Sequence, residues 1–203
     1  MADKYFISDY CTIKQGRITH NRQEVFAAPD FPFADFAKLA YKQAETDYPK
    51  FFKMDNLSKL SFLAADLLLK GQPVDGTNNT ALLFANASSS LDTDVKYNSS
   101  IADKENYFPS PAVFVYTLPN ICMGEISIKH KLYTENSFFI FEAFNPDFFV
   151  NYAAILLDTN KADKVLCGWV EFFKDDYKAF MYLVSKEKGT AHTIENIQTL
   201  YNS

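Results

Sequence analysis

Two segments near the start of the chain repeat apolar residues at helical spacing. Between residues 31 and 47 the apolar positions fall on one face of a helix, which Pro49 ends. A second helix begins at Asp55, a residue suited to an N-cap, and ends at Gly71, as expected of a C-terminal glycine. Its apolar stripe consists of Leu57, Leu60, Ala64, Leu67 and Leu68.

Short apolar runs bounded by turn residues predict the strands. Residues 80–86, Thr-Ala-Leu-Leu-Phe-Ala-Asn, form a continuous run typical of a strand buried on both faces. The opening residues 5–14 indicate a strand with a kink or hairpin, followed by a polar loop through Gln23. Three further runs predict strands at residues 137–141, 164–168 and 178–184.

The remaining apolar segments predict three more helices. Residues 111–131 indicate a long buried helix that is irregular near Pro119 and Gly124. Residues 147–157 follow a strand and predict a helix, and residues 193–201 predict a short terminal helix with one apolar side.

The order of these elements indicates the fold class. Strands that alternate with helices favour a largely parallel sheet covered on both faces, and the short link between the last two strands favours an antiparallel edge. We therefore expect an α/β fold, a three-layer αβα sandwich with a five-stranded mixed sheet. A chain of 203 residues with 48% hydrophobic content can bury one substantial core, so residues 1–203 are expected to form a single domain.

Composition and charge narrow the function. A net charge of -5 disfavours nucleic-acid binding, which needs a basic face. The N-terminus lacks the features of a secretion signal and no apolar run reaches the length of a membrane span, so we expect a cytoplasmic protein without a membrane partner. Cys11, Cys122 and Cys167 have no paired spacing, which predicts buried, reduced thiols and no metal site. No cofactor is expected.

The strand at residues 137–141 runs almost directly into a helix. Asn145 suits the N-cap of that helix and Pro146 its first position. Such an elbow is where an enzyme can present a thiolate, because unpaired N–H groups at the helix N-terminus lower the pKa of a cysteine. The turn at residues 142–144, Glu-Ala-Phe, contains no thiol.

Several strings resemble, in order, the N-terminal half of the β-ketoacyl-acyl carrier protein synthases, which are thiolase-like condensing enzymes. Residues 53–55, Lys-Met-Asp, resemble the family's opening of a helix. Residues 120–124, Asn-Ile-Cys-Met-Gly, with His-Lys-Leu at 130–132, are similar to its long buried helix. Residues 167–171, Cys-Gly-Trp-Val-Glu, resemble its strand ending in Ala-Gly-Gly-Ala-Glu. The resemblance spans most of the chain and is closest to the short, free-standing half-synthases of aryl polyene and pigment clusters.

This resemblance implies a site without its nucleophile. Counting back from residues 167–171 without a gap places the family's nucleophilic cysteine on Ala143. A methyl group cannot form a thioester, which excludes acyl transfer through this position. Family members also take two histidines and a lysine from a C-terminal half, which the resemblance places outside these 203 residues. We therefore expect no catalytic residue in the chain.

Other reactive groups have simpler interpretations. Glu142 is a candidate base, but a carboxylate at a sheet end more commonly pairs with a nearby donor. Cys122 lies in an apolar segment, where a thiol resists ionisation. His20, His130 and His192 share no motif and are interpreted as surface or solvated histidines. Residues 87–110 are interpreted as a polar surface connection without a ligand, despite Ser88, Ser89, Ser90, Asp92 and Asp94.

Two groups of residues are candidates for partner binding. By the resemblance, Lys50 and Lys53 flank a helix start where related synthases dock the acidic acyl carrier protein; the alternative is two solvated lysines on an acidic chain. Four phenylalanines are placed by the same resemblance near a twofold axis across which condensing enzymes pair their nucleophile strands, and the alternative is a role in the core alone. They are Phe138, Phe139, Phe141 and Phe144.

Three functions follow from these expectations. The main hypothesis is a non-catalytic ketosynthase-like subunit of fatty-acid or polyketide-type biosynthesis. It would form a homodimer, or a heterodimer with a full-length ketosynthase, and shape an acyl tunnel or assist carrier docking. The second is an active 3-oxoacyl-acyl carrier protein synthase whose site is completed by a partner. The third is a binding protein for acyl ligands, which requires an enclosed apolar pocket near Ala143.

Overall fold

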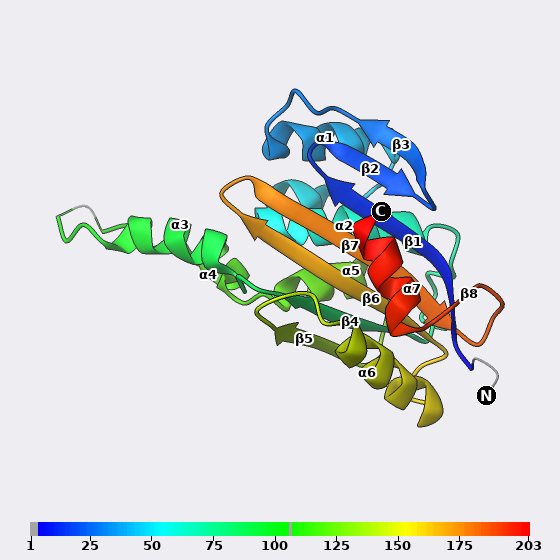
Figure 1. The fold of residues 1–203 in the computed structure, drawn as a ribbon. Coiled ribbons are helices and arrows are strands. Elements are labelled where there is room, and N and C mark those ends of the chain that lie inside the picture. Colours follow the sequence, from blue (N-terminus) through cyan, green and yellow to red (C-terminus); the bar gives the residue numbers. More distant parts are fainter. Residues whose placement is uncertain (1–3, 106) are drawn as a thin grey trace.

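The computed structural model describes residues 4–105 and 107–203, with one mixed β-sheet at its centre (Figure 1). The sheet has eight strands; seven follow the order β3-β2-β1-β7-β6-β4-β5, and β8 pairs with β1. The strands are β1 (Phe6–Lys14), β2 (Arg17–His20), β3 (Gln23–Ala27), β4 (Thr80–Asn86), β5 (Asn136–Ile140), β6 (Lys164–Phe173), β7 (Asp176–Ser185) and β8 (Thr190–Ala191).

Helices cover both faces of this sheet, as the predicted three-layer arrangement requires. One face packs against α1 (Phe33–Gln43), α2 (Asn56–Leu69) and α5 (Ile121–His130), and the other against α6 (Pro146–Asp158) and α7 (Ile194–Asn202) (Figure 1). Strand β4 is covered on both faces of the sheet, because all seven of its residues are buried. Leu82 and Phe84 enter the first core, whereas Ala81, Leu83 and Ala85 enter the second.

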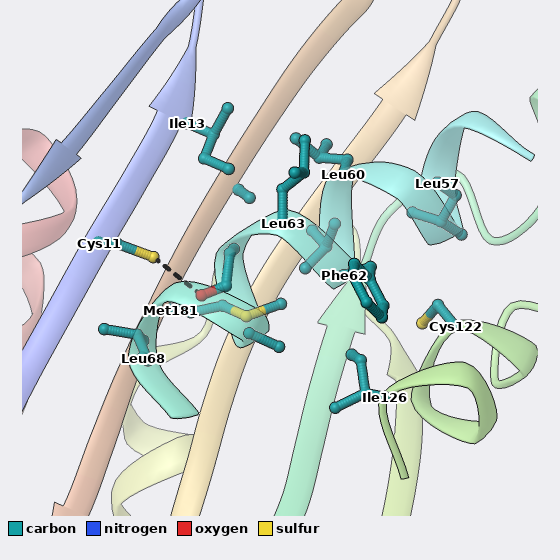
Figure 2. Close-up of a cluster of buried hydrophobic side chains, with 14 of the residues drawn as sticks. Cys11, Ile13, Leu57, Leu60, Phe62, Leu63, Leu68, Cys122, Ile126 and Met181 are labelled. Atoms are coloured by element: carbon teal, nitrogen blue, oxygen red, sulfur yellow. Dashed lines mark hydrogen bonds between the residues drawn. The ribbon is translucent and has the colours of Figure 1, made fainter. Parts of the chain in front are cut away.

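Helix α2 is the centre of the first core. Figure 2 shows Phe62 of this helix next to Cys122 and Ile126 of α5, and Leu57, Leu60, Leu63 and Leu68 along the same helix in front of the sheet. Its predicted cap is confirmed, because the Asp55 side chain accepts a hydrogen bond from the backbone N–H of Ser58 at 2.9 Å. The thiol of Cys11 donates to the carbonyl of Ala64 at 3.5 Å (Figure 2). Each fully buried leucine or phenylalanine here contributes about 1.5–3 kcal/mol relative to exposure in water.

The prediction of five strands is wrong in number. The five predicted strands are present as β1, β4, β5, β6 and β7. The segment interpreted as a polar loop through Gln23 forms β2, and the two further strands are β3, which begins at Gln23, and the short β8. Two-residue turns join β1 to β2 and β2 to β3, with positive φ at Gln15 (49°), Gly16 (69°), Asn21 (47°) and Arg22 (70°). Such turns match the twist of a hairpin. In β2 and β3 only Ile18 is buried, and the apolar Val25 and Ala27 are exposed, so these strands lack a clear alternation of buried apolar and exposed polar residues.

The predicted pairing of the sheet is also corrected. Only β4–β5 and β4–β6 are parallel pairs, and five other pairs are antiparallel. The β6–β7 hairpin is antiparallel as expected, yet it lies inside the sheet because β1 returns to pair with β7. The edges of the main path are β3 and β5. Local sequence patterns do not indicate that β1, at the start of the chain, pairs with β7 near its end.

Two helical segments differ from expectation. Residues 87–110 contain a helix, α3 (Leu91–Ile101), in which only Thr93 is buried, so its apolar pattern is weak. The single helix expected at 111–131 is divided into α4 (Pro111–Phe114), the 3-10 helix η2 (Val115–Thr117) and α5. The break lies at the predicted Pro119, which has no N–H to donate. The part before the break is exposed rather than buried: Phe114, Val115 and Leu118 are about half exposed.

Another short 3-10 helix, η1 (Pro49–Lys53), joins α1 to α2. Among the described residues, no helix has the length and apolar character needed to cross a membrane.

Candidate functional site

The predicted elbow is present between β5 and α6. Strand β5 ends at Ile140 and α6 begins at Pro146, with Asn145 at the N-cap. The Asn145 side chain accepts a hydrogen bond from the backbone N–H of Phe148 at 3.1 Å. The N–H of Phe141 donates to the carbonyl of Asn86 at 3.0 Å, which ties the turn to the end of β4. The local sequence therefore builds the geometry of an elbow at the carboxyl ends of the parallel strands.

The turn of this elbow faces solvent and carries no thiol. Ala143 and Glu142 are both exposed. The three cysteines are free and fully buried elsewhere. Burial raises the pKa of Cys122 to about 12, and it also raises the pKa of Cys11 and of Cys167. None of these buried thiols is present as the reactive thiolate at neutral pH.

The carboxylate that organises this end of the sheet is Glu171, not Glu142. Glu171 stands near the end of β6, and its Oε2 accepts hydrogen bonds from the N–H groups of Ala87 (2.7 Å) and Ser88 (3.2 Å). It thereby fixes the turn that follows β4. Glu142 makes no ion pair within the described part of the chain, so its expected pairing is not observed. The sequence offered one signal for this role, because Glu171 is a charged residue within the otherwise apolar run of β6.

The four phenylalanines proposed for partner binding are half-buried and lie on two faces of the sheet. Phe138 packs against the α2 and α5 core, whereas Phe139, Phe141 and Phe144 pack against the α6 and α7 core. The Phe139 ring lies 4.6 Å from that of Phe148, and Phe144 stacks on Tyr201 with ring centroids 4.3 Å apart. Much of their surface is therefore used within the chain.

The exposed apolar residues of this end lie on the β5 edge and on a projecting segment. Ile140, the last residue of β5, is 50% exposed. Residues 91–105 and 107–118, which we call the arm, follow the end of β4 and project from the body (Figure 1). Contact between the rings of Tyr97 and Phe114, 5.3 Å apart, joins its helices. Its exposed apolar residues are Leu91, Val95, Tyr107, Phe108, Phe114, Val115 and Leu118.

The two candidate lysines have different environments. Lys50 Nζ lies 3.2 Å from Oε2 of Glu125, a buried carboxylate that also accepts a hydrogen bond from the Tyr48 hydroxyl at 2.7 Å. Lys50 therefore has a structural role in compensating a buried charge. Lys53 is exposed and borders a small hollow of about 140 Å³ that two more lysines, Lys59 and Lys96, also line. Lys59 and Lys96, which together with Lys53 form what we call the lysine cluster, were not predicted, and Asp55 and Asp92 line the same hollow.

Two of the three histidines are buried, which corrects their interpretation as solvated. His130 Nε2 lies 3.1 Å from Oδ1 of Asp66, and His192 packs near the ring of Tyr182. Burial lowers the pKa of His192 to about 4. His20 is half-buried beside Asp9. In residues 4–105 and 107–203, no three His, Cys, Asp or Glu side chains gather as a metal site would require.

An acyl-binding function requires an apolar pocket near Ala143, but the apolar hollow that the structure contains lies elsewhere. That hollow, of about 470 Å³, lies between α1, α2, α5 and the β2–β3 hairpin. These segments of α2 and α5 precede β4 and β5, so the hollow lies at the amino ends of the parallel strands, opposite the elbow.

Comparison with known proteins supports the fold. The sequence matches no family model and no curated protein. Solved structures match over most of the chain. The ishigamide ketosynthase/chain length factor has a TM-score of 0.65 at 17% identity over 90% of this chain and 62% of its own. The ketosynthase ApeO in complex with its chain length factor ApeC, from Xenorhabdus doucetiae, has 0.61 at 14% identity, over 98% and 90%.

A third structure, the AntDE:AntF complex of a type II polyketide synthase acyl carrier protein with its ketosynthase, gives 0.57 at 14% identity, over 91% of this chain and 63% of its own. The chain has the ketosynthase fold. It spans less than two-thirds of the matched chains in the first and third of these structures. The expected α/β class and the resemblance to ketosynthases therefore agree with the fold, and the fold places Ala143 at a strand-to-helix elbow.

Proposed function

We propose that residues 1–203 act as one ketosynthase-like domain that has no condensing activity of its own and associates with a complete ketosynthase or with a second copy. The observation that carries this proposal is the exposed methyl group of Ala143 at an otherwise well-formed elbow. Covalent acyl transfer needs a nucleophile at that point, and the buried thiols of the chain do not supply one. The biosynthetic setting we propose is of the fatty-acid or polyketide type.

The association surface we propose is the free edge of β5 together with the arm. Among the described strands β5 pairs only with β4, so its outer backbone groups are available to a strand of a partner. Ile140 and the exposed apolar residues of the arm lie at the same end of the sheet. Exposed apolar patches of this kind mark interaction sites. Among the matched structures are ketosynthases that are paired with a chain length factor or a carrier protein, which supports a role in such an assembly.

The half-buried phenylalanines would then support this surface from behind. Phe139 and Phe141 pack on Phe148 and hold β5 against α6. Carrier docking, the second part of the proposal, is assigned to the lysine cluster, because Lys50 is engaged by Glu125. Positive charge on an acidic chain favours an acidic partner at that point.

Replacement of Ile140 tests the association. The full chain is co-expressed with a ketosynthase from its own organism, and complexes are measured by analytical ultracentrifugation with and without Ile140→Lys. We expect a defined complex or dimer for the native chain and at least a roughly thirtyfold weaker association for the variant, as for loss of an interface hot spot. Val25→Lys is the matched control, because Val25 is 45% exposed on β3, the opposite edge strand.

Two outcomes would contradict the proposal. One is a monomer at micromolar concentration that forms no complex with the ketosynthase. The other is equal weakening by Ile140→Lys and Val25→Lys, which would show that the β5 edge has no special role.

A further inference from the structure

The hollow at the amino ends of the parallel strands has the size and lining of a small-molecule site. Its volume of about 470 Å³ lies within the usual range for such sites. Apolar side chains form most of the wall, among them Leu63 and Leu67 of α2 and Phe26 of β3. Val25 and Val74 at its rim are 45% and 44% exposed, so apolar surface stays open to solvent here.

A polar group stands within this apolar wall. Leu63, Asp66 and Leu67 follow one another at i, i+3 and i+4 on one face of α2, and all three line the hollow. Oδ2 of Asp66 accepts a hydrogen bond from the Thr46 hydroxyl at 2.5 Å, and Oδ1 lies 3.1 Å from Nε2 of His130. Burial alone would raise the pKa of Asp66, but these two neighbours outweigh it and lower the pKa below its usual value. The carboxyl group is therefore ionised at neutral pH.

The polar group has unused hydrogen-bonding capacity. An ionised carboxylate offers about four acceptor positions, and two neighbours occupy only part of them. The side chain of Asp66 keeps 16% of its surface exposed, whereas that of His130 keeps 5%. Within the described residues, neither ring nitrogen of His130 has a well-aligned hydrogen bond. Buried polar groups that lack such partners are uncommon and indicate an additional ligand or a functional role.

The cations at the rim are already engaged. Lys129 Nζ donates to the carbonyl of Asp47 at 2.9 Å, and Lys70 Nζ donates to the carbonyl of Ala44 at 3.4 Å. Both lysines hold the backbone that follows α1, at the edge of the hollow. Glu45 and Asp47 also line the hollow but are exposed, so the part-buried charge next to the apolar wall is the carboxylate of Asp66. It repels an acid and accepts hydrogen bonds from a donor.

We propose that this hollow binds a small amphipathic molecule, with an alkyl or aryl body against Leu63 and Leu67 and a hydroxyl or ammonium head that donates to Asp66. The site is separate from the association surface proposed above, which lies at the opposite end of the sheet. The two proposals can therefore be tested independently.

Three probes of equal length test the head group on the full, isotope-labelled chain by nuclear magnetic resonance. They are 1-hexanol, hexylamine and hexanoate. We expect the alcohol or the amine to shift backbone signals of residues 63–74 and 129–130 with a Kd of about 1 mM, as its small size allows. Hexanoate should bind at least about tenfold more weakly. The first two arms distinguish a hydroxyl from an ammonium ligand.

Variants separate the head group from the apolar body. Asp66→Asn should remove the difference in affinity between hexanoate and the alcohol or the amine. If this variant fails to fold, Leu67→Trp, which fills the hollow from its rim, should reduce binding of all three probes at least about tenfold. Ile155→Trp, at a residue 56% exposed on α6, is the matched control and should change nothing. Equal binding of hexanoate, or no shift in these residues with any probe, would overturn the proposal.

Discussion

The two ends of the parallel strands differ in the kind of surface they present. At the carboxyl ends, apolar residues lie on an edge strand and on the projecting arm, and the elbow between β5 and α6 carries the exposed Ala143. At the amino ends, apolar residues surround a hollow with a charged group in its wall. An open edge with an extended apolar surface suits a protein partner, whereas a hollow with one polar anchor suits a small molecule. The two proposals therefore assign different classes of binding partner to the two ends of one sheet.

The ends also differ in their titratable groups. Both buried histidines belong to the amino end: His130 precedes β5, and His192 lies beside the start of β1, which pairs with the end of β7. At the carboxyl end, Glu171 accepts hydrogen bonds from the turn that follows β4, and a backbone hydrogen bond from Phe141 to Asn86 ties the elbow to the same strand.

Restoring a thiol at the elbow should give the largest effect. Ala143→Cys places a cysteine on an exposed turn, whereas the native cysteines are buried and the pKa of Cys122 is raised to about 12. The thiolate is the reactive form, so we expect the new thiol to react with a disulfide reagent at least about a thousandfold faster than any native one. One thiol per chain should titrate in the folded variant, measured by absorbance against the native chain.

The comparison fails if the native chain reacts at a similar rate. Fast labelling without the substitution would mean that a native cysteine is accessible, and the argument that no thiol replaces the nucleophile would be lost. Slow labelling of the variant would mean that the elbow is less open than its exposure indicates.

Much of this elbow could be predicted from sequence because its signals are local. An apolar run, an N-cap asparagine and a following proline lie within ten residues and fix both elements. The Asp55 cap and the buried strand β4 were predicted for the same reason. The sheet order was not, because the pairing of β1 with β7 joins distant segments.

The amino-end site shows the same limit more sharply. Asp66 and His130 come together only because α2 packs against α5, and no spacing in the sequence indicates it. The arm was missed because its helix buries almost nothing, so it has no apolar face to detect. Phenylalanines at β5 were identified as candidates, but their positions on two faces of the sheet depend on strand pairing.

Acid should lower the free energy of unfolding through His192, which lies at the amino end. The pKa of His192 falls from 6.5 to about 4 on folding, because its ring is buried. Between these pH values the unfolded chain binds a proton that the folded chain does not, so the free energy of unfolding decreases as the pH falls through this window. The expected loss attributable to His192 is about 3 kcal/mol. Urea unfolding from pH 7 to pH 4 measures it.

Substitution of His192 isolates this contribution. His192→Gln is neutral at every pH in this range, so its unfolding free energy should depend less on pH than that of the native chain by the amount lost from His192. An unchanged pH dependence would show that another group controls the response to acid. The buried histidine at the amino end would then not distinguish the stability of that end.

The smallest expected effect concerns carrier docking at the carboxyl end. Lys53 and Lys96 are exposed beside the arm and border one hollow, whereas Lys161 is an exposed lysine at the amino end. Reversing the first two charges, Lys53→Glu with Lys96→Glu, should weaken binding of an acyl carrier protein about three- to tenfold at low salt, because exposed ion pairs contribute about 0.2–1 kcal/mol each. Added salt should reduce the difference, since it screens exposed charges. Lys161→Glu is the matched control in the same titration and should leave the affinity unchanged. If all three substitutions weaken binding equally, the carrier responds only to net charge. The proposal of a specific docking surface at the carboxyl end would then be wrong.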